Sequence, residues 1–298
     1  MTKNLAIILV AMAGICWASS GVAVQGFFSH SDKTPMELTN IRMCTAGALM
    51  IAILFLRGKF LKSFLRLKMK THLIIHLALY GFFGVVMVQF TYFKAISIGG
   101  AAATTVILSS VPAMVVIWDS FYKKKFPRRA EILAVIFAML GVFLLVTGGN
   151  PTKLLVPLSC VLWSLSSGAF FAFSMIFGKN LIAEKIDPTF MTSTGMFFGG
   201  LSTFALIDNK NWSPFFQSEV IFYVAWIVIF GTAIAFLIFN AGLKFLTPEE
   251  AAITSTSEPA SSVVISYFVF GTAFGLIESV GIFLVLLAII SPVVLKKL

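Results

Sequence analysis

The sequence predicts an all-α integral membrane protein of ten transmembrane helices, arranged as two inverted five-helix repeats. Two observations predict the class and a third predicts the arrangement. Hydrophobic residues make up 59% of the 298-residue chain and charged residues only 11%, whereas soluble domains carry about 25% charged residues. Apolar runs long enough to cross a bilayer follow one another along the chain. A stretch in the first half has a counterpart of equal length in the second half.

Ten segments satisfy the length criterion of about 20 mostly apolar residues. The first is longer than a signal-peptide core and lacks an obvious A-x-A cleavage site, so we expect a retained helix. Connections are short except for a basic stretch at residues 57–70, which fits an amphipathic helix on the membrane surface. The expected spans are residues 4–28, 36–56, 72–97, 101–121, 130–147, 153–177, 189–207, 219–245, 249–269 and 275–295.

The placement of lysine and arginine predicts the orientation, because cytoplasmic loops carry an excess of both. With the N-terminus inside, most basic residues fall on the cytoplasmic side and only Lys33, Lys153 and Lys210 fall outside. We therefore expect a multi-pass protein of the cell (cytoplasmic) membrane with both termini in the cytoplasm. The net charge of +10 then reflects topology, and nucleic acid is not an expected partner.

The sequence contains no recognisable metal or catalytic signature. Cys16, Cys44 and Cys160 lie within apolar segments and form no CxxC pattern, which argues against a disulfide framework or metal site. His72 and His76 are one turn apart without a third ligand nearby, so interface anchoring is the preferred interpretation. A phosphate-binding loop, an HExxH motif and a GxSxG motif are all missing from the sequence. We expect no cofactor, no catalytic residue and no enzymatic activity.

The stretch at residues 83–113 is repeated without a gap at residues 230–260. Both copies begin with Phe-Gly, contain a short break and end at Pro-Ala, but Glu258 in the second copy stands where the first has Val111. Because each half contains an odd number of spans, the second is inverted relative to the first, as in secondary transporters whose substrate site lies at the repeat interface. The expected repeats are residues 1–149 and 150–298. Further matching pairs are Trp17 with Trp163, Pro35 with Pro188, and Glu131 with Glu278.

Together these features resemble the drug/metabolite transporter superfamily and its EamA-type ten-helix branch. The resemblance covers essentially the whole chain. It implies two inverted bundles around a central cavity, with spans 1–4 and 6–9 lining the cavity and spans 5 and 10 at the periphery. In place of the Gly-Glu that relatives carry after spans 4 and 9, this chain has Lys124-Lys125 and Gly271-Thr272. The residues that carry the resemblance are Trp17, Pro35 followed by Arg42, Tyr92-Phe93-Lys94-Ala95, and Glu258-Pro259.

Glu258 is the strongest candidate for binding a substrate cation or a proton. An ionised acid in mid-membrane costs roughly 2.5–3.5 kcal/mol on insertion scales, so it has to face protein or water. Helical spacing places Ser255 and Ser262 on the same face, and Pro259 loosens the backbone one turn earlier. The alternative is a neutral or paired carboxyl group that fixes span 9 against a neighbouring helix.

Arg42, in the outer third of span 2, is a second charge within the membrane. It could bind a substrate carboxylate with both arms of its guanidinium, pair with Glu258, snorkel outward, or serve packing and conformational change. Trp17, followed by Ser20, and its counterpart Trp163 could enclose a ring or an ammonium group. Ordinary packing beside small residues is the alternative for both tryptophans.

Three polar residues in other spans complete the candidate set. Gln89 and Tyr92 are three positions apart on span 3 and could point inward together. Asn240 on span 8 suits a cavity wall or an interhelical hydrogen bond equally well.

The sequence therefore predicts a secondary transporter that moves a small organic metabolite by alternating access. Glu258 and the tryptophans favour an amino acid or an amine-like substrate. Export and import are both open, as is the choice between proton coupling and facilitated transport. The alternatives are a neutral substrate such as a nucleobase or vitamin, an uncoupled channel, and a non-transporting membrane scaffold. Expected partners are the small-molecule substrate, the lipid bilayer and, for a coupled mechanism, protons; we expect a monomer or weak dimer.

Overall fold

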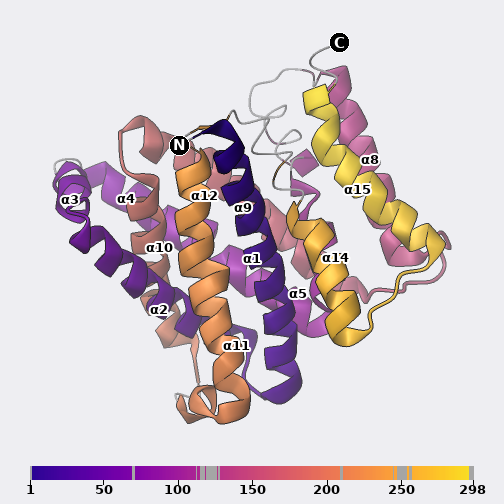
Figure 1. The fold of residues 1–298 in the computed structure, drawn as a ribbon, viewed down its shortest axis with the longest axis horizontal. Helices are drawn as coiled ribbons and strands as arrows, with labels where there is room; N and C mark the ends of the chain where they lie inside the picture. Colours follow the sequence, from indigo (N-terminus) through magenta and orange to yellow (C-terminus); the bar gives the residue numbers. More distant parts are fainter. Residues whose placement is uncertain are drawn as a thin grey trace.

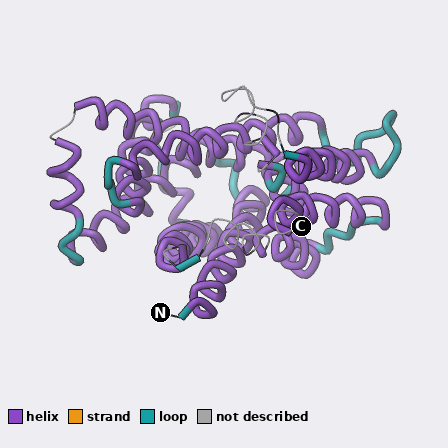
Figure 2. Tube along the Cα trace, turned by 90° about the horizontal axis from the view of Figure 1, so that it is seen from above, coloured by secondary structure: helices purple, strands orange, loops and turns teal. Residues whose placement is uncertain are grey.

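The structure is a computed structural model in which every regular element of the described residues is a helix (Figures 1 and 2). It describes residues 2–68, 71–111, 113–114, 118, 126, 128–208, 211–243, 245–246, 254 and 257–294. Two elements, η1 and η4, are π-helical, and η2 and η3 are short 3-10 turns. In chain order the elements are α1 (Lys3–His30), α2 (Pro35–Leu56), α3 (Phe60–Lys68), α4 (Thr71–Leu79), η1 (Tyr80–Val86), α5 (Met87–Gly99), α6 (Ala101–Leu108), α8 (Arg129–Thr147), α9 (Leu158–Ala183), α10 (Pro188–Thr203), η2 (Phe204–Leu206), η3 (Ser213–Phe216), α11 (Ser218–Val228), η4 (Ile229–Ile234), α12 (Ala235–Leu243), α14 (Ser257–Phe270) and α15 (Leu276–Val294).

Several of these helices have the length and composition of membrane spans. Within the described residues two shorter apolar helices, Ile132–Thr147 and Leu276–Ala288, accompany the long ones. The expected spans 101–121 and 249–269 lie partly outside the described residues, so the count of ten stays a prediction. The five long apolar helices found in the described part of the chain are Lys3–His30, Pro35–Leu56, His72–Gly99, Leu158–Met175 and Ser218–Phe239.

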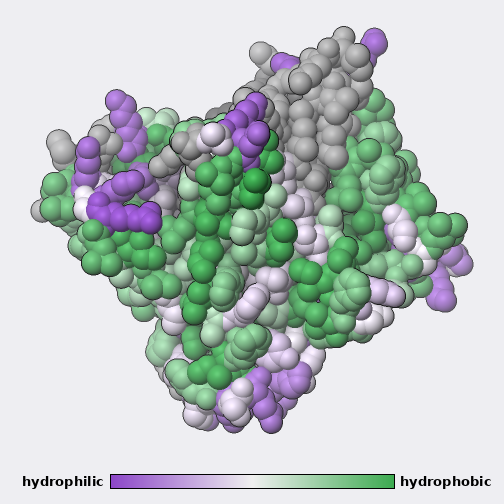
Figure 3. Space-filling model, in the orientation of Figure 1, coloured by the Kyte–Doolittle hydropathy of each residue, from purple (hydrophilic) through white to green (hydrophobic). Residues whose placement is uncertain are grey.

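The surface has the distribution of side chains that a bilayer requires. Hydrophobic residues cover the middle of the face shown in Figure 3, and hydrophilic residues gather toward its ends. Large apolar side chains such as Met12, Leu162 and Phe268 are exposed along the helices. Such a surface would aggregate in water, but in a membrane it faces lipid while the helices satisfy their own backbone groups.

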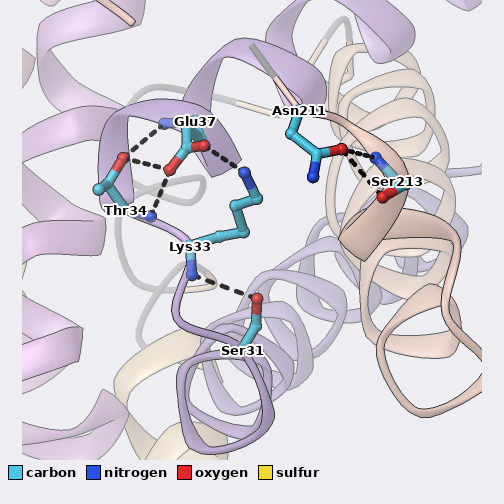
Figure 4. Close-up of polar contacts among 6 residues, drawn as sticks. All are labelled: Ser31, Lys33, Thr34, Glu37, Asn211 and Ser213. Atoms are coloured by element: carbon cyan, nitrogen blue, oxygen red, sulfur yellow. Dashed lines mark hydrogen bonds and ion pairs between the residues drawn. The ribbon is translucent and has the colours of Figure 1, made fainter. Parts of the chain in front are cut away.

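The second helix begins with a capping box that the local sequence dictates. Thr34 Oγ1 accepts from the Glu37 amide at 3.3 Å, and Glu37 Oε2 accepts from the Thr34 amide at 2.8 Å (Figure 4). Lys33 Nζ also donates to Glu37 Oε1 at 2.6 Å. Pro35 occupies the first turn, where its missing amide hydrogen costs nothing. The helix therefore starts where the sequence predicts it.

Helix α10 starts in the same way at the matching proline of the second half. Asp187 Oδ1 accepts from the amides of Thr189 and Phe190 at 2.8 and 3.2 Å, and Pro188 stands in the first turn. Both halves thus use a polar cap followed by proline, which makes the two prolines a sound reference for aligning α2 with α10.

Helices α2 and α10 cross as antiparallel neighbours. Asn40, near the start of α2, donates to the Gly200 carbonyl at 2.8 Å, near the end of α10. Where they cross, a Cβ on Gly47 would lie 2.6 Å from the Phe197 amide nitrogen, and a Cβ on Gly200 would lie 3.0 Å from the Cys44 nitrogen. Glycine at both places allows the two backbones to meet directly.

Helices α8 and α15 form a second antiparallel pair at one edge of the molecule (Figure 1). Gly149, just after α8, lies against Ile277 at the start of α15. Further along, a Cβ on either Gly141 or Gly281 would lie 2.6 Å from the carbonyl oxygen of the other. This pair corresponds to the spans that the family resemblance places at the periphery.

Candidate functional site

Two π-helical segments, η1 and η4, lie at matching places in the duplicated stretch. Each contains the Phe-Gly pair that opens one copy: Gly84 lies in η1 and Gly231 in η4. Both glycines meet a serine of a neighbouring helix, because a Cβ on Gly84 would lie 2.8 Å from Ser174 and one on Gly231 would collide with Ser20. The sequence predicted the two spans but not their π-helical interruption. Such interruptions often mark functional sites, since they disturb the regular hydrogen bonds.

Arg42 is buried, with 3% of its surface exposed, and donates to two neighbouring spans. Its Nε donates to Thr232 Oγ1 at 2.8 Å, and its Nη2 donates to the Gly231 carbonyl at 3.1 Å, both in η4. Its Nη1 donates to Gln89 Oε1 on α5 at 2.8 Å. The guanidinium also lies over the ring of Phe93 at 5.1 Å. Each nitrogen of the guanidinium therefore has a protein partner.

A chain of three buried hydroxyl groups joins α5, α6 and α14. The Tyr92 hydroxyl and Thr105 Oγ1 are 2.8 Å apart, and Ser262 Oγ donates to Thr105 Oγ1 at 3.4 Å. Helix α1 packs against the Tyr92 hydroxyl, because a Cβ on Gly21 would lie 2.8 Å from it. These contacts connect spans 3, 4 and 9 of the expected topology.

Glu258 lies in the first turn of α14, beside α1, and is partly exposed. Ser257 Oγ donates to the Ala11 carbonyl at 3.2 Å, and a Cβ on Gly14 would lie 3.1 Å from the Glu258 amide nitrogen. The carboxyl group interacts electrostatically with Arg42 and with the Tyr92 hydroxyl. Among the described residues, Glu258 and Arg42 form no direct ion pair.

Helix α1 is the common wall of these groups. Gly14 lies beside Glu258, Ser20 beside Gly231, and Gly21 beside the Tyr92 hydroxyl. At 1.5 Å per residue, the Glu258 level and the Gly231 level are about 10 Å apart along α1. The small residues of α1 therefore allow close approach of the α14 backbone at Glu258 and, further along, of the π-helix η4 that Arg42 binds.

The two tryptophans have separate aromatic partners. Trp17 contacts the rings of Phe236 and Phe239 on α12, at centroid distances of 5.3 and 4.9 Å. Trp163 contacts Phe90 on α5 at 5.8 Å. The ring contacts of the described residues include none between the two indoles, so a sandwich formed by both tryptophans stays a prediction.

The remaining candidates differ in how far the structure describes them. Ser20 Oγ is buried without a hydrogen-bond partner among the described residues. Gln89 Oε1 accepts a hydrogen bond from Arg42 Nη1. Asn240 lies on α12, but its side chain is outside the described part, and Ser255 lies outside the described residues altogether.

Sequence reasoning missed Thr105, Thr232 and Gln25. The signal for Thr232 was available, since it directly follows the second Phe-Gly pair. Gln25 Oε1 accepts from the Ala101 amide at 2.7 Å and so connects α1 to the start of α6. The preceding Gly100 has a φ of 80°, a left-handed conformation that glycine tolerates. Nothing local in the sequence shows that Gln25 meets this turn.

Comparison with known proteins agrees with the fold and identifies the family. The EamA-like transporter family matches residues 4–147 and again residues 158–292. The uncharacterized inner membrane transporter YicL of Salmonella typhimurium is 28% identical over 281 residues, covering 94% of this chain and 92% of its own. Two uncharacterized transporters of Bacillus subtilis, YwfM and YxxF, are 24% and 23% identical, covering 97% and 95% of this chain and 94% and 88% of their own.

One solved crystal structure, described only as that of a protein, has a TM-score of 0.67 and 16% sequence identity, and the match covers 99% of both chains. At this identity the likeness concerns the fold alone. The two family matches together cover most of the chain and confirm the resemblance that its motifs predict. The chain therefore belongs to the EamA-like transporter family.

Proposed function

We propose that the protein is a secondary transporter that moves a small organic metabolite across the cell membrane by alternating access. Its substrate is held between two inverted five-helix repeats, close to the wall formed by α1. Family membership and the relatives described as uncharacterized transporters support transport as the general activity.

The observation that carries the mechanism is the reciprocal contact between α2 and α10. Aligning their first-turn prolines also aligns Gly47 with Gly200 and Cys44 with Phe197. Gly47 meets Phe197, and Gly200 meets Cys44, so each contact has its counterpart with the helices exchanged. Such reciprocity between antiparallel helices is what a two-fold axis in the membrane plane produces. Inverted repeats related by this axis support a site that opens to each side in turn.

Glu258 supports a substrate that carries an ammonium group. It is the acid on the α1 wall, it is partly exposed, and Tyr92, Thr105 and Ser262 supply hydroxyl groups nearby. The nitrogens of Arg42 are already bound to protein acceptors. An amino acid or amine is therefore favoured, with its positive group at Glu258.

The orientation follows from the basic residues between α2 and α4. Arg57, Lys59 and Lys62 are exposed around the start of α3, while Leu61 and Leu65 of the same helix expose apolar surface. A helix of this kind fits a membrane surface, and its excess of positive charge supports the cytoplasmic side. Both termini are then cytoplasmic.

A thermal-shift screen of the purified protein against amino acids, amines, nucleobases and vitamins tests the substrate class. A ligand that binds the native state raises the unfolding temperature, and we expect amines or amino acids to do so. Uptake of the radiolabelled hit into proteoliposomes then tests transport. Stabilisation by neutral nucleobases or vitamins alone would reject the substrate class, and single-channel currents would reject alternating access. A failure of every hit to cross the bilayer would favour a scaffold.

A further inference from the structure

We propose that Arg42 is a positioning residue that clamps the π-helix η4 to the first repeat. The clamp is inferred from the hydrogen bonds of the Arg42 side chain, whereas its effect on transport rests on the proposed function. Arg42 comes from α2 and Gln89 from α5, both in the first family match. Gly231 and Thr232 belong to η4, in the second match. The hydrogen bonds of Arg42 therefore tie one repeat to the other.

The π-helical conformation of η4 supplies the acceptor that the clamp uses. In an α-helix the amide of Ala235 would donate to the Gly231 carbonyl, but here it donates to the carbonyls of Phe230 and Thr232. Arg42 Nη2 donates to the Gly231 carbonyl at 3.1 Å. Thr232 Oγ1, which accepts from Arg42 Nε, in turn donates to the Ile227 carbonyl at 2.8 Å. Backbone and side-chain groups of the π-helix are thus bound by the same guanidinium.

At the equivalent place in the other half, α10 has a glycine instead of an arginine. The proline alignment of α2 with α10 matches Arg42 to Gly195. There α10 packs directly on η1: a Cβ on Gly81 would lie 2.9 Å from Gly195 Cα, and a Cβ on Gly199 would lie 3.0 Å from the Gly81 carbonyl oxygen. Tyr80 of η1 also forms a side-chain hydrogen bond with Thr192 of α10. The contacts of η1 with α10 thus combine glycine packing with a neutral hydrogen bond, whereas η4 is bound by a charged side chain. The two halves therefore differ in the residue that contacts the π-helix, as they also differ at Glu258.

This difference gives η4 a charged contact that can change partners. A guanidinium can exchange one hydrogen-bond acceptor for another, whereas the glycine contacts of η1 with α10 are fixed by the two backbones. When the two repeats rock, the bonds from Arg42 to Gly231 and Thr232 have to break or shift, because they cross from one repeat to the other. Arg42 therefore positions η4 in the arrangement seen here and releases it in the opposite one.

Hydrogen–deuterium exchange of the purified full-length protein in lipid nanodiscs, without substrate, tests the clamp. The variants are R42Q and the matched pair Thr232→Val and Thr232→Ser, of which only the serine variant keeps the hydroxyl group. We expect exchange in peptides covering Ile229–Ile234 to rise at least about tenfold in R42Q and to rise in T232V, because hydrogen bonds to a charged group contribute to local stability. T232S and the control Lys94→Gln should match the parent, and Tyr80–Val86 should stay protected throughout.

Two results would overturn the proposal. One is unchanged exchange at Ile229–Ile234 in both R42Q and T232V. The other is an equal rise in both π-helices, which would show that Arg42 stabilises the fold as a whole. If R42Q does not fold, the comparison of T232V with T232S decides the question alone. Since exchange is measured without substrate, this result is separate from whether the protein transports amines.

Discussion

The guanidinium of Arg42 on α2 donates to the carbonyl oxygen of Gly231 in η4 at 3.1 Å. Gly231 is the glycine of the Phe-Gly pair in the second copy. A side chain of the first repeat therefore donates a hydrogen bond to this pair. On its other side Gly231 meets Ser20 of α1. This residue therefore connects α1, α2 and the π-helix, and the acid at Glu258 lies about 10 Å further along the same α1 wall.

Replacing Glu258 by glutamine should remove transport of the amine or amino acid found in the ligand screen. The amide keeps the size of the side chain but cannot neutralise an ammonium group. We expect uptake into proteoliposomes to fall by at least about tenfold, the equivalent of ~1.4 kcal/mol of lost interaction. Glu219→Gln, which changes an exposed acid at the start of α11, is the control and should transport normally. Full uptake by E258Q would exclude Glu258 from the substrate site.

Replacing Arg42 by lysine should slow transport more than it weakens ligand binding. Lysine keeps the charge but cannot reach Thr232, Gln89 and the Gly231 carbonyl together. We expect the ligand-induced thermal shift to persist while the maximal uptake rate falls several-fold. If R42K instead loses the thermal shift and keeps its melting temperature, Arg42 binds substrate directly.

Removing the Thr105 hydroxyl group should lower the free energy of unfolding, and the size of the loss should depend on whether Tyr92 keeps its own hydroxyl group. Thr105→Val leaves the Tyr92 and Ser262 hydroxyls without their partner, which costs about 1–3 kcal/mol for a buried polar group. Tyr92→Phe should cost less when Thr105 is already valine, because residues in contact are not additive. Chemical denaturation of both single variants and the double variant measures the coupling. Additive losses would show that the two hydroxyl groups do not interact.

Enlarging Gly47 or Gly200 should destabilise the protein by similar amounts. A Cβ at Gly47 would meet the Phe197 backbone and one at Gly200 the Cys44 backbone. Backbone cannot move aside as a side chain does, so each alanine variant should lose about 1–3 kcal/mol of stability. Gly275→Ala is the control, since there the nearest group is the Glu278 side chain. A large loss at one of the two positions only would contradict the reciprocal crossing.

Cysteines introduced at Lys62 and Lys153 should react with a membrane-impermeant maleimide from opposite sides. Both positions are exposed, and the proposed orientation has Lys62 inside and Lys153 outside. In intact cells we expect labelling of K153C, and of K62C only after the cells are opened. Labelling of K62C in intact cells would show that the orientation is the opposite of the one proposed. The parent chain measures any background from Cys16, Cys44 and Cys160.

Much of the fold can be predicted from local features of the sequence. The starts of α2 and α10 follow from Thr34-Pro35 and Asp187-Pro188, because a polar cap and a proline act within one turn. The duplicated stretch similarly locates the counterpart of each Phe-Gly pair. The difference between Glu258 in one copy and Val111 in the other is also visible in the sequence alone, because it requires only an alignment of the two copies.

Most partners within the candidate site could not be predicted in this way. Arg42 had four open interpretations in the sequence, and the contacts with Gln89, Gly231 and Thr232 select among them. The hydrogen bond that Gln25 accepts from the start of α6 had no local signal in the sequence either. Each of these contacts joins helices that are distant in the chain.

By itself the sequence determined that the protein is helical and apolar enough for a membrane, that it is built from two related halves, and which polar residues stand within its apolar helices. These properties depend on composition and on spacing along one chain. The tertiary structure alone decided that η1 and η4 are π-helical, that Arg42 binds η4, and that α1 is the shared wall. The reason is physical: hydrogen-bond partners of a buried side chain are set by which helix packs beside it, and close packing at glycine depends on both backbones at once.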